Sequence, residues 1–140
     1  MPPRRPGAYI LFITLETPID CPIGKRHRQM TFPAGSYVYI GSARNGLDQR
    51  ITRHIRTTKK THWHIDYLLP HTHTIHAYYT TNTHQTECHL ATTFHKHHTP
   101  IPNFGNSDCT CPTHLYYGTP TALLTTIQSL HLTKYPLSKS

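Results

Sequence analysis

The distribution of apolar residues predicts strands that alternate with helices. An apolar, β-branched run over residues 8–15 is typical of a central strand. Two further runs, 36–41 and 72–80, predict a second and a third strand. The prolines and glycines of 16–35 predict a long connection that could form a hairpin loop with a basic tip, so the first two strands should pair antiparallel. We expect an α/β domain with a small, mostly antiparallel three-stranded sheet flanked by helices.

An apolar stripe that repeats every four residues predicts a helix over 47–58. The stripe consists of Leu47, Ile51 and Ile55. Arg50 and His54 should lie together on one flank of this stripe, where their side chains can reach over the sheet edge. Arg53 and Arg56 should point to the opposite side of the helix.

A second helix, predicted over 85–97 with Thr83 as its N-cap, carries the most informative polar residue. Its inner face is formed by Leu90, Ala91 and Phe94. Glu87 precedes them by three, four and seven residues and therefore falls on the same face. A carboxylate on a core face is costly unless it is paired or binds a metal. Glu87 is therefore a candidate functional residue on this ground alone.

The remaining patterns complete a single domain over the whole chain. Residues 63–69 predict a short helix, 114–117 a final strand, and the residues after Pro120 a C-terminal helix. Residues 1–6 and about 132–140 should be terminal tails.

The charge balance of the chain indicates which kind of partner the protein binds. The chain has 14 Lys+Arg against 6 Asp+Glu, a net charge of +8, and a pI near 9.5. Such an excess favours a polyanion such as a nucleic acid or an anionic membrane, and of these we expect a nucleic acid and no membrane. No apolar run approaches the roughly 18 residues of a membrane span, and the start lacks a signal-peptide core, so we expect a cytoplasmic protein. The candidate nucleic-acid-binding residues are Lys25, Arg26, Arg28, Arg44, Arg53, Arg56, Lys59, Lys60 and His62.

Four short motifs occur in an order that resembles the GIY-YIG nuclease superfamily. They are Gly7-Ala8-Tyr9, Tyr39-Ile40-Gly41, the Arg50/His54 pair on the first helix, and Glu87 on the second. The first motif has Ala8 where the superfamily has isoleucine. The stretches HWHIDYLL, TECHLA and FGNSDCTCPTHLYY are similar to the small Uri-type branch and extend the likeness to about residue 117.

The resemblance implies a divalent-metal-dependent endonuclease that hydrolyses phosphodiester bonds in DNA. Glu87 would be the protein ligand of Mg²⁺ or Mn²⁺, and Arg50 would bind the scissile phosphate. Tyr9 and Tyr39 would frame the attacking water, with Tyr39 as the expected base. His54 would carry a proton or bind phosphate.

Other functions fit the same residues. A non-catalytic nucleic-acid-binding module could keep the nuclease fold. An RNA nuclease is a further alternative, because phosphates alone do not identify the sugar. A partner protein or domain could supply DNA specificity, and the pathway could be repair or defence against mobile elements.

Two groups of residues leave alternatives open. The cysteines lack regular disulfide spacing, so we expect thiols or metal ligands. Cys109 and Cys111, in the loop 99–113, could form a zinc site with Cys88 and His114, or the thiols could be buried and brace the loop. Trp63 and Leu68 could pack against the sheet. Alternatively, His62 or His64 could line a phosphate groove.

Overall fold

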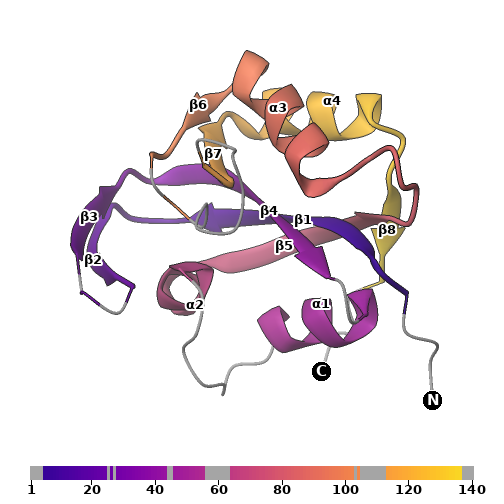
Figure 1. The fold of residues 1–140 in the computed structure, drawn as a ribbon. Helices are drawn as coiled ribbons and strands as arrows, with labels where there is room; N and C mark the ends of the chain where they lie inside the picture. The colour runs from indigo at the N-terminus through magenta and orange to yellow at the C-terminus, as the bar shows by residue number, and fades with distance from the viewer. Residues whose placement is uncertain are drawn as a thin grey trace.

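A central sheet with helices on both faces forms the domain (Figure 1). The computed structural model describes residues 5–24, 26, 28–43, 46–55, 64–102, 104 and 113–136. Within these ranges, none of the helices is long and apolar enough to cross a membrane.

The central sheet is larger than the sequence predicted. Its strand order is β6-β7-β4-β1-β5-β8, and each neighbouring pair is antiparallel. The α/β class and the antiparallel pairing are confirmed, but the expected number of three strands is wrong, because six are present in the described residues. The strands are β1 (Gly7–Leu15), β4 (Gly35–Ala43), β5 (His73–Thr80), β6 (Thr99–Pro100), β7 (Leu115–Gly118) and β8 (Thr133–Tyr135).

Two strands of the central sheet that the sequence pattern does not predict are short and lie at the sheet edges. β6 has two residues and β8 has three, too few for a periodic pattern. Part of the expected C-terminal tail therefore forms β8, which pairs with β5. The connection between β1 and β4 folds into a separate two-stranded sheet, the hairpin of β2 (Ile19–Ile23) and β3 (Arg28–Phe32).

The helices cover opposite faces of the sheet (Figure 1). On one face lie α1 (Leu47–Ile55) and α2 (His64–Leu68), and α2 continues into the 3-10 turn η1 (Leu69–His71). On the other face lie α3 (Glu87–His97) and α4 (Pro120–Ser129). The cap of α3 is Thr86, whose side chain accepts a hydrogen bond from the amide of His89, and the expected cap Thr83 is wrong.

Alternation along β1 divides the core into two parts. Tyr9, Leu11 and Ile13 face α1 and α2, whereas Ile10 and Phe12 face α3 and α4. β1 pairs with β4 over nine residues, from Gly7 opposite Ala43 to Leu15 opposite Gly35, and the second tyrosine of the motifs, Tyr39, belongs to the same part of the core as Tyr9.

Candidate functional site

The two tyrosine–glycine motifs meet across the β1–β4 pair. Tyr9 lies directly opposite Gly41 in the ladder. A Cβ atom on Gly41 would come within 2.3 Å of both the Cζ atom and the hydroxyl oxygen of Tyr9. The Tyr9 ring therefore lies against the Cα atom of Gly41. Position 41 must be glycine because the ring occupies the space of its side chain.

Gly41→Ala is therefore expected to displace Tyr9. Tyr9 is fully buried, so its ring cannot swing into solvent to make room. We expect overpacking to lower the free energy of unfolding by about 1–3 kcal/mol. Denaturant unfolding measures this, with Ser42→Ala as the matched control in the same strand. A Gly41→Ala protein as stable as the control would contradict the close packing.

Helix α1 brings His54 onto Tyr9. The Tyr9 hydroxyl and His54 Nε2 are hydrogen-bonded at 2.6 Å. The two ring centroids are 5.4 Å apart, and Tyr39 lies 6.4 Å from Tyr9 and 6.0 Å from His54. His54 is only 3% exposed. Three groups that can carry protons thus form one cluster beneath α1.

Burial keeps both phenols protonated. It raises the pKa of Tyr9 and of Tyr39 above the ordinary value for tyrosine. The Arg50 guanidinium acts in the opposite direction on each pKa, and the Glu87 carboxylate raises both. At neutral pH the two side chains are therefore neutral phenols with a cation and a carboxylate nearby.

Arg50 is held beside this cluster by the backbone of β4. Its Nη1 atom donates to the carbonyl oxygen of Ser42 at 3.0 Å. The expectation that Arg50 and His54 share one flank of α1 is consistent with these contacts, since both act on Tyr9. This placement leaves a guanidinium next to two phenols, an arrangement suited to an anionic group.

Glu87 lies in the other helical layer, at the start of α3, and its charge acts on both phenols. It is the first residue of α3, and Leu90, Ala91 and Phe94 behind it are buried as expected. Its side chain is 20% exposed, so the expected interior position is corrected to a partly open one. The Glu87 Oε2 atom lies 3.6 Å from Nδ1 of the buried His114, just before β7.

Arg53, predicted on the opposite side of α1 and as a nucleic-acid contact, forms an ion pair with α2. It forms two hydrogen bonds with the carboxylate of Asp66 in α2, at 3.0 and 3.1 Å. The Asp66 side chain is 1% exposed and that of Arg53 is 19% exposed. The helical periodicity of α1 predicts the direction of Arg53 but not this ion pair, because the partner belongs to α2. Arg53 therefore joins α1 to α2.

The other basic candidates divide between the hairpin and undescribed residues. Arg26 and Arg28 are exposed at the end of the β2–β3 hairpin. The remaining ones lie outside the described residues: Lys25, Arg44, Arg56, Lys59, Lys60 and His62. Leu68 is buried as expected, and Trp63 also lies outside the described part of the chain.

The donor set bears on which metal the site could hold. Among the described side chains, no group of three or more His, Cys, Asp and Glu gathers to hold an ion. Glu87 offers one partly exposed carboxylate, which fits Mg²⁺, because that ion keeps several waters and uses few protein carboxylates.

Only two of the four candidate zinc ligands, Cys88 and His114, lie within the described residues. Cys88 is disulfide-bonded, so the expected thiol is wrong at this position, and Cys109 and Cys111 lie outside the described residues. A disulfide sulfur is not the thiolate that zinc requires. Of the expected thiols, Cys21 is free and buried.

His114 is a candidate zinc ligand by sequence, but its contact with Glu87 is not predicted. Its Nδ1 atom lies 3.6 Å from Glu87 Oε2. The two residues come from segments far apart in the chain, and no local pattern links them.

Comparison with known proteins yields one match. No curated protein and no solved structure matches the chain. A family model, described as a domain of unknown function, matches residues 8–134 and so includes all five candidate catalytic residues. The chain therefore belongs to the DUF123 family.

Proposed function

We propose that the chain is a divalent-metal-dependent endonuclease that hydrolyses phosphodiester bonds in DNA. The observation that carries this proposal is the 2.6 Å hydrogen bond between Tyr9 and His54, with Arg50 and Glu87 acting on the same phenol. The motif order that resembles GIY-YIG nucleases supports it independently. A hydrogen-bonded proton acceptor, a guanidinium and a partly exposed carboxylate are the groups that phosphodiester hydrolysis requires.

The Tyr9–His54 pair supports a path for the proton of the attacking water. With the proton of the neutral imidazole on Nδ1, His54 Nε2 accepts the hydrogen bond from Tyr9. As the water oxygen bonds to phosphorus, its proton passes to the Tyr9 oxygen and the phenol proton passes to Nε2. The P–O ester bond breaks, and the leaving oxygen takes a proton from solvent. The family resemblance implies Tyr39 as the base. The hydrogen bond favours Tyr9, because a buried phenol needs an acceptor for its proton.

Arg50 would stabilise the charge that develops on the phosphate. A guanidinium presents several donors in a fixed plane and can hold two phosphate oxygens. The Ser42 carbonyl takes one of its N–H groups and so orients the plane. Glu87 would hold Mg²⁺ or Mn²⁺, which when bound supplies charge stabilisation at the phosphate oxygens.

Nucleic-acid affinity is expected to fall steeply with salt. Each neutralised phosphate releases counterions, with a log–log slope of roughly −0.9 per contact on duplex DNA. Exposed Arg26 and Arg28 are candidate contacts. Replacing both with alanine should weaken binding and flatten this slope, whereas Lys96→Ala, at the exposed end of α3, should do neither. Fluorescence anisotropy against salt concentration measures both effects. An affinity that does not depend on salt would exclude nucleic acid as the ligand.

The direct test of the proposed function is cleavage of a substrate panel. Branched, nicked, single-stranded and duplex DNA, with matched RNA, is incubated with the protein in Mg²⁺, Mn²⁺ or EDTA. We expect metal-dependent cleavage of at least one DNA. The Tyr9→Phe protein, purified in the same way, controls for contaminating nuclease. If the protein cleaves only RNA, the proposed substrate is RNA and not DNA. Binding without cleavage in either metal would favour the non-catalytic module.

A further inference from the structure

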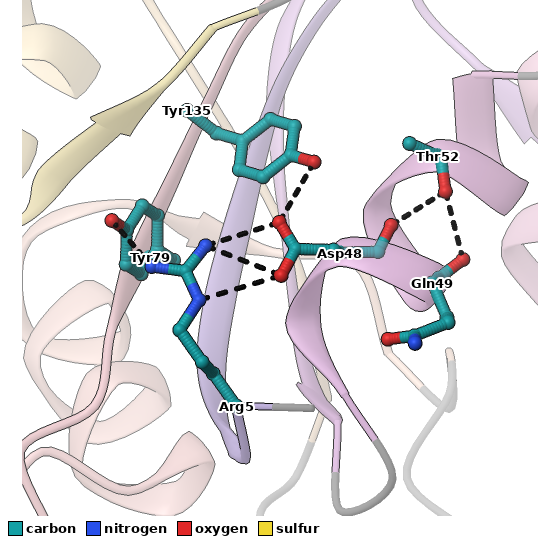
Figure 2. A network of polar contacts seen from close by, with 6 residues as sticks. All are labelled: Arg5, Asp48, Gln49, Thr52, Tyr79 and Tyr135. Atoms are coloured by element: carbon teal, nitrogen blue, oxygen red, sulfur yellow. Dashed lines mark hydrogen bonds and ion pairs between the residues drawn. The ribbon is translucent and has the colours of Figure 1, made fainter. Parts of the chain in front are cut away.

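A polar network outside the candidate site joins α1 to three other segments (Figure 2). The Arg5 guanidinium donates to the carboxylate of Asp48, with Nη2 at 3.0 Å from Oδ1 and Nε at 3.3 Å from Oδ2. The Tyr135 hydroxyl donates to the same Oδ1 at 3.0 Å. Arg5 Nη1 also donates to the Tyr79 hydroxyl at 3.0 Å, and its Cζ atom lies 4.8 Å from the centre of that ring.

The members of this network come from distant parts of the chain. Arg5 precedes β1, Tyr79 belongs to β5, and Tyr135 ends β8. Asp48 is in the first turn of α1, and the amide of its neighbour Leu47 donates to the Arg5 carbonyl at 2.7 Å. Both termini of the described domain are therefore attached to the start of one nine-residue helix.

The protonation states strengthen the attachment. The hydrogen bond from Arg5 lowers the pKa of Asp48, and burial raises the pKa of Tyr135. At neutral pH Asp48 is thus a carboxylate that accepts from a guanidinium and a neutral phenol. Its negative charge in the first turn also suits the positive end of the helix dipole.

We propose that Asp48 is a positioning residue for the candidate site, an inference that rests on the proposed function. Arg50 and His54 follow Asp48 on the same short helix, so a rotation or shift at the start of α1 moves both. The 2.6 Å bond between Tyr9 and His54 leaves little room for such a shift. In a catalytic site, a misplacement of about 1 Å can reduce the rate about a hundredfold.

The test compares Asp48→Asn and Tyr135→Phe with Ile127→Val. The first two remove the charge and the hydroxyl of the network, and the third trims the core beneath α4 on the other face of the sheet. Histidine side chains are labelled with ¹⁵N, and the His54 Nε2 signal is recorded for each protein. Cleavage rates and affinity for uncleaved DNA are measured alongside.

We expect the His54 signal to move in both network variants and to stay in place in Ile127→Val. Cleavage should fall about ten- to a hundredfold in Asp48→Asn, and less in Tyr135→Phe, with little change in DNA affinity. An unmoved His54 signal in folded Tyr135→Phe and Asp48→Asn would overturn the positioning role. If Asp48→Asn does not fold, Tyr135→Phe decides alone. If the wild-type protein cleaves nothing, the proposed function fails, but the His54 spectra still decide whether the network positions α1.

Discussion

Glu87→Gln is expected to abolish cleavage in Mg²⁺ or Mn²⁺ while leaving folding and DNA binding intact. Glutamine keeps the shape of the side chain but removes the charge that a hard cation requires. The Glu87 side chain is only 20% exposed, so the substitution removes the cost of desolvating its charge, and the metal-free variant should be at least as stable as the wild type. A nicking assay run beside thermal melting, with and without Mn²⁺, measures both properties.

The matched control is Glu16→Gln. Glu16 is a carboxylate at the end of β1, 74% exposed and 3.4 Å from a histidine, so the substitution removes the same charge outside the candidate site. The control should cleave as the wild type does. Full cleavage by Glu87→Gln would refute its role as metal ligand. A Glu87→Gln protein that cannot fold would show instead that the carboxylate is structural.

Arg53→Ala is expected to lower the free energy of unfolding by about 1.5–3 kcal/mol. Removing the guanidinium takes two hydrogen bonds from the buried Asp66 carboxylate. Replacing both members with apolar residues, in Arg53→Met with Asp66→Leu, should recover most of the loss, because no buried charge then remains. Denaturant unfolding of the single and double variants measures these changes.

Arg28→Ala provides the comparison for Arg53→Ala. It removes an exposed arginine of the hairpin and should leave the free energy of unfolding nearly unchanged. If Arg53→Ala instead lowers DNA affinity at wild-type stability, Arg53 contacts DNA, as the sequence had suggested, and its ion pair contributes little.

The elements that sequence analysis predicted best are those with a long periodic pattern. The nine-residue strands β1 and β4 and the apolar stripe of α1 are each specified by their own residues. The position of Glu87 on the face of Leu90 could be inferred for the same reason. By contrast, β8 has three residues, and its place in the sheet depends on pairing with β5.

The contacts that sequence analysis missed are tertiary. Helical periodicity predicts the side of α1 on which Arg53 lies. It does not predict the carboxylate that binds Arg53, because that carboxylate belongs to α2. Likewise, Glu87 meets His114 because α3 and the segment before β7 converge near β4. The tyrosine motifs could be predicted only in part. The alternation of side chains along a strand predicts which face of the sheet each tyrosine occupies. The position of Tyr9 opposite Gly41 depends on the register between β1 and β4, which is a tertiary property.

The ladder between β1 and β4 makes the chemistry of this protein depend on strand register. Side chains alternate between faces, so a slip of one residue would turn Tyr9 toward α3 and α4 and bring Ile10 under His54. Such a misfolded form would keep its strand and helix content and could pass a circular dichroism test, yet the candidate site would lack Tyr9. Gly41 opposes this error, because its missing side chain accommodates an aromatic ring at one register alone. A preparation of this protein should therefore be tested for the Tyr9–His54 contact, because purity and helix content do not show that β1 has the correct register.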